Sequence, residues 1–264
     1  MTDWIDAGGV ALRYELSGEG PRVVVLIHEM GGTLESWESI MPVLRRHYRT
    51  LRFDMRGFGL SEKIRGPITL EQLADDVRAL LDALGLPLPV AVVGCAVGAA
   101  VALCFAARHP DRTAMLAVSS PSTGIAPERR GGVLDRIARF ERDGLRAVEE
   151  ASLGASYPAS LRQRDPARFE ATRLRWLGND PSSFAAVNRM LVQLDLTTEF
   201  PRITAPALLI GCTLDGVRPP QGVAALARLI QGAQFATVES GHFLALQNPD
   251  GLLAQLMPFL AKGW

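Results

Sequence analysis

Residues 90–103 read VAVVGCAVGAAVAL, a sequence typical of a strand, a sharp turn and a helix. Val90 to Val93 is a largely β-branched run, which favours a buried strand. Gly94 then permits a sharp turn, and the small residues from Val97 onward favour a helix packed closely against that strand. A unit of this kind usually presents a reactive side chain at its apex. Here the apex is Ala96, which has no reactive atom.

The composition is that of a globular protein with balanced charge. Of its 264 residues, 48% are apolar, enough for one large α/β domain. Lys plus Arg and Asp plus Glu number 28 each, which argues against a nucleic-acid surface because such binding depends on neutralising phosphates. The three cysteines show no CxxC spacing, so we expect neither a disulfide framework nor a zinc site. We see no signal peptide and no apolar run of membrane-spanning length, and we expect a cytoplasmic protein with no membrane partner.

Strands and helices alternate along most of the chain. Gly8-Gly9 joins two short strands within residues 3–16. Further strands are expected near residues 23–27, 48–53, 90–93, 115–118, 207–210 and 234–238. Helical spacing covers residues 34–44, 70–84, 97–108, 220–229 and 249–260. Such alternation predicts parallel βαβ units in a doubly wound, mostly parallel sheet of about eight strands.

The alternation stops in the middle of the chain. Residues 122–196 are rich in charged residues, Ser and Pro, and they are predicted to form several short helices. An insertion at this point would cover the carboxyl ends of the strands, where doubly wound sheets bind ligands. We therefore predict an α/β core of residues 1–121 and 197–264 with a helical lid of residues 122–196. Within the lid, Trp176 and Met190 are candidate substrate-binding residues.

Three candidate catalytic positions follow three expected strands. Gly94 and Gly98 frame Ala96 as a nucleophile elbow of the form G-x-S-x-G frames its serine. Asp215 follows the strand near 207–210, and His242 follows the strand near 234–238. A lone aspartate is usually a turn former and a lone histidine a structural group. All three together, in the order nucleophile, acid, histidine, instead indicate a catalytic triad.

Five motifs carry a family resemblance over nearly the whole chain. They are LIHEMGGTLESW, FDMRGFGLS, VVGCAVGAA, CTLDGVRPP and SGHFLALQNP. In order and spacing they resemble the α/β-hydrolase fold family, and the chain is most similar to 3-oxoadipate enol-lactonases and related small serine hydrolases. The resemblance implies that Asp215 and His242 serve a serine nucleophile, and that the amides of Val97 and Met30 form an oxyanion hole.

The resemblance also implies the chemistry of the reaction. It implies cleavage of an ester, lactone or amide of a small organic molecule, with no metal or organic cofactor. An activated carbon–carbon bond uses the same apparatus, so the sequence leaves the bond type open. We find no phosphate loop or dinucleotide glycine pattern and expect no nucleotide cofactor. The oligomeric state is also open, and a homodimer is compatible with the sequence.

Two residues depart from the family pattern: Ala96 replaces serine, and Glu29 follows the loop histidine where glycine is usual. We consider three interpretations of Ala96. The first is an engineered replacement of serine in an otherwise intact hydrolase, and the second is a naturally non-catalytic ligand-binding protein. The retention of Asp215 and His242 favours the first. In the third, Cys95 is the nucleophile, which we reject because Val93 and Val97 would then fill positions that need small residues.

Glu29 has two interpretations. Its carboxylate either projects into the pocket and contacts substrate, or turns away and is held by backbone amides of the Gly31-Gly32 turn. The second is favoured because a carboxylate beside the oxyanion hole would repel developing negative charge. Other charged residues are interpreted as structural: Asp54 and Arg56 as braces for loops, and the arginines of one predicted helix as a solvated face rather than an anion clamp. Those arginines are Arg129, Arg130, Arg136, Arg139 and Arg142.

Overall fold

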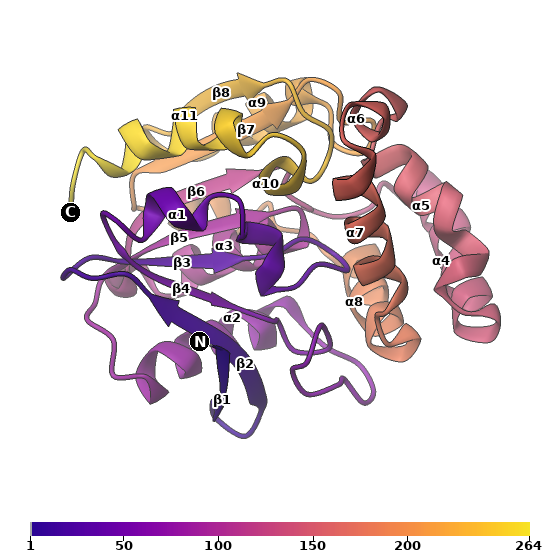
Figure 1. Cartoon of the computed structure of the whole chain (residues 1–264), viewed down its shortest axis with the longest axis horizontal. Coiled ribbons are helices and arrows are strands. Elements are labelled where there is room, and N and C mark those ends of the chain that lie inside the picture. The colour runs from indigo at the N-terminus through magenta and orange to yellow at the C-terminus, as the bar shows by residue number, and fades with distance from the viewer. Residues whose placement is uncertain (1) are drawn as a thin grey trace.

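An eight-stranded, mostly parallel sheet forms the centre of the protein, and helices cover both of its faces (Figure 1). The computed structural model describes residues 2–264. The strand order is β1-β2-β4-β3-β5-β6-β7-β8, with β2 antiparallel to both of its neighbours. The strands are β1 (Thr2–Asp6), β2 (Ala11–Ser17), β3 (Val23–Ile27), β4 (Arg49–Phe53), β5 (Val90–Cys95), β6 (Thr113–Ser119), β7 (Ala207–Cys212) and β8 (Gln234–Val238). The predicted fold class is confirmed.

The central strands are buried on both faces, as their continuous apolar sequences predict. In β3, Val23, Val25 and Ile27 pack into one apolar cluster, while Val24 and Leu26 pack into another on the opposite face. The first cluster includes side chains from helices α2 (Leu70–Ala83), α3 (Val97–Arg108) and α9 (Pro220–Ala227). The second cluster includes side chains from η1 (Leu34–Trp37), α1 (Met41–Leu44), α10 (Leu244–Gln247) and α11 (Pro249–Leu260).

One predicted helix is divided in the structure. Residues 34–44 form a single turn, η1, followed by the short helix α1. Pro42 lies at the start of α1, where its missing amide hydrogen is tolerated, whereas inside a longer helix it would break a hydrogen bond. Trp37, Ile40 and Met41 are all buried by this arrangement. Burial of these side chains therefore overrides the simple helical periodicity of the segment.

The segment between β6 and β7 supplies a group of helices that Figure 1 shows beyond one end of the sheet. Single 3₁₀ turns lie in this segment and in the connection before β6. They are η2 (Pro110–Arg112), η3 (Leu145–Val148) and η4 (Phe200–Arg202). The inserted helices are α4 (Pro127–Asp143), α5 (Glu149–Ser156), α6 (Ala159–Arg164), α7 (Pro166–Leu177) and α8 (Pro181–Gln193). None of the helices in residues 2–264 is long and apolar enough to cross a membrane.

The starts of α7 and α8 follow from an Asp-Pro pair repeated in the sequence. The Asp165 carboxylate accepts a hydrogen bond from the Arg168 amide, and the Asp180 carboxylate accepts one from the Ser183 amide. Each aspartate thus satisfies an amide that has no acceptor inside the helix, and each proline fits the first helical position.

The turn from β5 to α3 brings backbone segments into direct contact. A Cβ atom on Gly98 would collide with the carbonyl oxygens of Ile27 and His28 and would lie 2.6 Å from the carbonyl carbon of Ile27. A Cβ on Gly94 would lie 2.7 Å from the Cα of Ala99. Only glycine fits at either position without moving the backbone, so these two residues set the closeness of α3 to the sheet.

We expect Gly98→Ala to lower the free energy of unfolding by about 1–3 kcal/mol or more, because the added methyl group meets backbone atoms that cannot rotate away. The matched control is Gly132→Ala in α4, where an added Cβ would meet nothing within 4 Å. That variant should gain roughly 0.5–1 kcal/mol, because alanine loses less conformational entropy in a helix. Urea unfolding measures both, and equal stabilities for the two variants would contradict the packing argument.

Candidate active site

Ala96 lies at the apex of the β5–α3 turn in a backbone conformation that non-glycine residues rarely adopt. Its φ and ψ angles are 54° and −113°. Backbone hydrogen bonds hold it there: its amide donates to the Ser119 carbonyl at 3.0 Å, and its carbonyl accepts from the Ser122 amide at 3.1 Å. Such a conformation costs on the order of 1–3 kcal/mol and persists only where the surrounding structure imposes it. The fold therefore keeps the apex geometry although alanine offers no nucleophile.

The amide of Val97 is positioned to bind a negative charge. Val97 is the first residue of α3, so its N–H has no acceptor within the helix. It also lies at the positive end of the helix dipole. This amide is adjacent to the Ala96 apex, which is the arrangement that an oxyanion hole requires.

His242 and Asp215 are joined by a hydrogen bond of 2.8 Å between Nδ1 and Oδ2. The other carboxylate oxygen of Asp215 accepts from the amides of Val217 and Arg218 at 2.8 and 2.9 Å. Burial acts to raise the pKa of Asp215, but the hydrogen bond and charge of His242 and the amide of Arg218 together hold that pKa below its ordinary value. An ionised Asp215 keeps the proton of His242 on Nδ1, so that Nε2 is the nitrogen available as a base.

His28 fixes the loop that follows β3. The side chain is fully buried, its Nδ1 donates to the Glu29 carbonyl at 2.7 Å, and its Nε2 accepts from the Met55 amide at 3.0 Å. The imidazole thus connects the loop after β3 to the loop after β4. Met30, whose amide is the second predicted oxyanion donor, directly follows this anchored segment.

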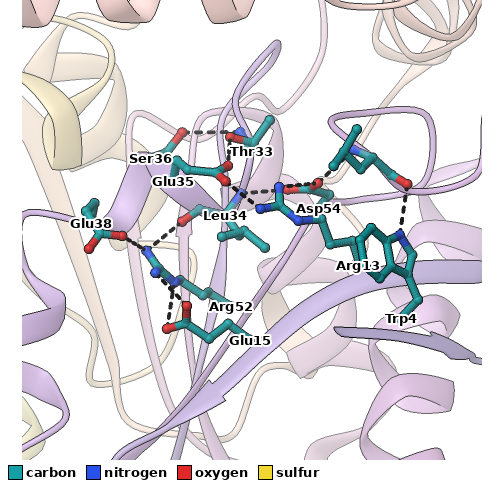
Figure 2. A network of polar contacts seen from close by, with 11 residues as sticks. Trp4, Arg13, Glu15, Thr33, Leu34, Glu35, Ser36, Glu38, Arg52 and Asp54 are labelled. Carbon is teal, nitrogen blue, oxygen red and sulfur yellow. Dashed lines mark hydrogen bonds and ion pairs between the residues drawn. The ribbon is translucent and has the colours of Figure 1, made fainter. Parts of the chain in front are cut away.

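Asp54 also holds the loop after β3 in place. Figure 2 shows the polar network around it. The Asp54 carboxylate accepts from the amides of Leu34 and Leu60, both at 2.8 Å. Arg13 lies 3.3 Å from Asp54 and 2.7 Å from Glu35. Burial acts to raise the pKa of Glu35, but hydrogen bonds from Arg13 and Thr33 outweigh it and lower the pKa to about 2. Asp54 therefore braces loops, as the sequence predicts.

A second arginine completes the network shown in Figure 2. Arg52 on β4 pairs with Glu15 at 2.9 Å and Glu38 at 2.7 Å, and it donates to the Leu34 carbonyl at 3.2 Å. Burial acts to lower the pKa of Arg52, but the two carboxylates raise it above its ordinary value. The loop after β3 is thus held by charged groups on both sides.

The Glu29 side chain turns away from the site. Its Oε1 accepts a hydrogen bond from the Ser36 hydroxyl at 2.8 Å, and its side chain does not line the cavity beside Ala96. The direction agrees with the favoured interpretation, but the partner is a hydroxyl rather than the amides of the Gly31-Gly32 turn. A Cβ on Gly32 would collide with the Glu29 carboxylate, so a glycine is needed there for this arrangement.

A cavity of about 220 Å³ opens between the apex and the inserted helices. Ala96, Met30 and His242 line it from the core, and Trp176 lines it from α7. Helix α8 contributes residues spaced along one face: Phe184, Asn188 and Leu191. Met190 lies on a different face of α8 and lines a second cavity with Ala186, Arg189 and Gln193, so it is not part of the wall beside Ala96. A helix presents residues three, four and seven apart on one side, which explains the separation.

The family described as "alpha/beta hydrolase fold" matches residues 22–249. The chain belongs to this family. The enol-lactonase from Burkholderia xenovorans LB400 has a similar structure, with a TM-score of 0.92 and 29% identity over 98% of this chain and 100% of that one. A thermophilic esterase from Thermogutta terrifontis, solved with malate bound, also has a TM-score of 0.92, with 27% identity over 99% and 98% of the two chains.

Among proteins of assigned activity, a pyrrolizixenacetamide deacetylase from Xenorhabdus hominickii is 25% identical over 97% of both chains. This α/β-hydrolase is therefore related to enol-lactonases, esterases and a deacetylase. All of them are named for hydrolytic reactions, and the match extends over essentially their full length.

Three arginines that sequence reasoning did not place in the site also line the cavity: Arg129, Arg136 and Arg218. The interpretation of the α4 arginines as a solvated face is wrong for Arg136, which is partly buried in the cavity wall. Arg129 is exposed but also lines the cavity, whereas Arg130, Arg139 and Arg142 are exposed and do not line it. The spacing of residues in α4 could have indicated that these arginines share a face with buried side chains. Arg129, Val133, Arg136 and Phe140 recur at steps of four, three and four residues, which places two arginines on the same face as two apolar side chains.

The ionised Asp215 should contribute to stability in a pH-dependent way. Because its folded pKa lies below the unfolded value of about 3.9, its contribution is present above that pH and is lost as the pH falls through the lowered pKa. We expect Asp215→Asn to lower the free energy of unfolding by about 1.5–3 kcal/mol at neutral pH, with a smaller gap below about pH 4.

Urea unfolding across this pH range tests the expectation. The exposed Asp135→Asn controls for the loss of one negative charge elsewhere on the surface. A gap between the parent chain and Asp215→Asn that stays constant down to acid pH would mean that the ionised carboxylate is not the stabilising form.

Proposed function

We propose that this protein is a hydrolase of small esters, lactones or amides in which Ala96 replaces the serine of a Ser–His–Asp triad. The observation that carries the proposal is the retained apex geometry: Ala96 keeps the strained elbow conformation and faces the same cavity as His242. Asp215 remains hydrogen-bonded to His242 at 2.8 Å. Drift in a protein without catalytic function would not be expected to preserve all of these features. On this proposal the alanine is an introduced substitution, and the chain as it stands is inactive.

With serine at position 96, each neighbouring group has a role. Nε2 of His242 takes the hydroxyl proton while Oγ attacks the carbonyl carbon, and Asp215 stabilises the imidazolium that forms. The amides of Val97 and Met30 bind the oxyanion, and each such donor typically contributes about 10²- to 10³-fold. The proton on His242 passes to the leaving group, and a water molecule activated by His242 then hydrolyses the acyl-enzyme.

The inserted helices act as the lid of this site. Asn179, which follows α7, donates to the Gly31 carbonyl at 3.0 Å, so the insertion is hydrogen-bonded to the proposed oxyanion loop. A Cβ on Gly31 would lie 2.5 Å from Cδ1 of Trp176, so the loop and the Trp176 ring are closely packed. Trp176 is thereby a wall of the substrate cavity rather than a remote core residue.

A second candidate function is the binding of a small ligand without turnover, and Ala96 itself favours it. Without Oγ the cavity can hold an ester or acid but cannot form an acyl-enzyme. Both candidates use the same cavity and differ only in what a serine at position 96 would do. Relatives named for lactone, ester and amide substrates leave the bond type open, and the malate bound to one of them is a small organic acid.

The deciding experiment is Ala96→Ser with an aryl acetate as substrate. We expect kcat to rise by on the order of 10⁴-fold over the parent chain, with a burst of aryl alcohol, because the serine regains its base and oxyanion donors. The double variant Ala96→Ser, His242→Ala controls for nonspecific reactivity and should show no burst. The double variant Cys95→Ser, Ala96→Ser tests the rejected nucleophile and should retain the burst. A correctly folded Ala96→Ser protein with neither burst nor turnover would favour the ligand-binding candidate.

A further inference from the structure

Arginines supply positive charge to the wall of the cavity beside Ala96, and no carboxylate of the described residues balances it there. Of the residues within 2–264 that line it, three are arginines and none is an aspartate or glutamate. The chain as a whole has 28 basic and 28 acidic residues, so its composition does not explain this excess. The fold concentrates positive charge in the wall of the proposed substrate site.

The three arginines come from two segments that are distant in the sequence. Arg129 and Arg136 lie on one face of α4, whereas Arg218 lies in the loop after β7, three residues beyond Asp215. Arg218 donates from Nη2 to the Gly124 carbonyl at 2.7 Å, which holds it against the segment that leads into α4. Arg136 and Arg218 are partly buried, and Arg129 is exposed at the edge of the cavity.

These guanidinium groups have no carboxylate partners within the described part of the chain. Arg129, Arg136 and Arg218 take part in none of its ion pairs, whereas other lid arginines such as Arg173 and Arg189 pair with glutamates. Nε of Arg218 is buried without a hydrogen-bond partner. A partly buried cation without a carboxylate partner is unfavourable, and a negatively charged ligand in this cavity would supply the missing charge.

The charge of Arg129 also acts on the other two arginines. Burial lowers the pKa of Arg136, and the charge of Arg129 lowers it further. Burial likewise lowers the pKa of Arg218, and Arg129 adds to that effect while Asp215 opposes it. Asp215 forms no ion pair with the Arg218 guanidinium; its carboxylate oxygens accept from His242 and from the amides of Val217 and Arg218. An anion placed among the three would relieve their mutual repulsion.

We propose that Arg129, Arg136 and Arg218 form a carboxylate-binding subsite, and that the ligand of this cavity is a small ester, lactone or amide with a free carboxylate. The ligand's hydrolysable bond rests on the proposed function, but the charge preference does not. Guanidinium groups bind carboxylates through paired, charge-assisted hydrogen bonds. The small volume of about 220 Å³ and the apolar neighbours Val133 and Phe140 suit a short aliphatic chain between the carboxylate and the ester. Glu29, turned toward Ser36, adds no negative charge to this subsite.

The test measures binding to the chain with Ala96, so that it does not depend on catalysis. The probes are the monomethyl esters of succinic, glutaric and adipic acid, with the corresponding dimethyl esters as neutral counterparts. Calorimetric titration should give at least about tenfold tighter binding for the best monomethyl ester than for its dimethyl counterpart, the minimum expected for hydrogen bonds to a charged group. Added salt should weaken only the binding of the acidic ester.

Substitutions then assign the preference to individual residues. Arg136→Gln and Arg218→Gln should each weaken binding of the monomethyl ester about tenfold and leave the dimethyl ester unchanged, whereas Arg136→Lys should retain part of the preference. The matched control is Arg139→Gln, an exposed arginine one turn along α4 that does not line the cavity. Unchanged thermal unfolding and unchanged binding of the neutral ester exclude misfolding as the cause.

Two results would overturn the proposed subsite. One is equal affinity for acidic and neutral esters, or no binding of the acidic ester at millimolar concentration. The other is a preference that survives both glutamine variants. Neither result bears on the hydrolase proposal, which depends on turnover of a neutral aryl acetate by Ala96→Ser. Conversely, an inactive serine variant that still prefers the acidic ester would support a carboxylate-binding protein without catalytic function.

Discussion

The close approach of helix α3 to the end of strand β3 is the constraint on which the site depends. Gly98 makes it possible because any side chain there would collide with the carbonyl oxygens of Ile27 and His28. The contact places the first amide of α3 beside the loop that follows β3, so the proposed donors Val97 and Met30 come from segments held together by backbone packing. Ala96 then has little choice of conformation, and its positive φ is a consequence of the turn rather than of its own side chain.

Buried polar groups hold the loops around this contact. His28 connects the loops after β3 and β4 through one hydrogen bond donated and one accepted, and Asp54 binds the amides of two further loop residues. An irregular loop cannot satisfy its own amides as a helix or sheet does, so these side chains take over that role. Charged partners are retained around them because an unpaired charge at such depth would be strongly unfavourable.

The distribution of charge separates the two acidic groups near the apex from the cavity. Glu29 faces Ser36, and Asp215 lies behind His242 with its oxygens occupied. The wall toward the inserted helices is instead formed by arginines together with apolar side chains. A neutral chain thus presents a basic cavity, because folding directs its acidic side chains to loop anchors, the histidine and surface pairs.

The sequence alone was enough to predict the α/β-hydrolase fold, the strands and most helices of the core, and the three strand ends that carry Ala96, Asp215 and His242. These features are local: apolar runs, glycines at fixed offsets and turn residues after strands act over a few positions. Three features became visible only in the folded chain: the direction of Glu29, the absence of Met190 from the cavity wall, and the convergence of Arg129, Arg136 and Arg218. Those outcomes depend on which side chains meet when distant segments pack together, as when the loop after β7 meets the segment that leads into α4. Such contacts join residues far apart in the chain, and the charges that a side chain meets there are not encoded by its neighbours in sequence.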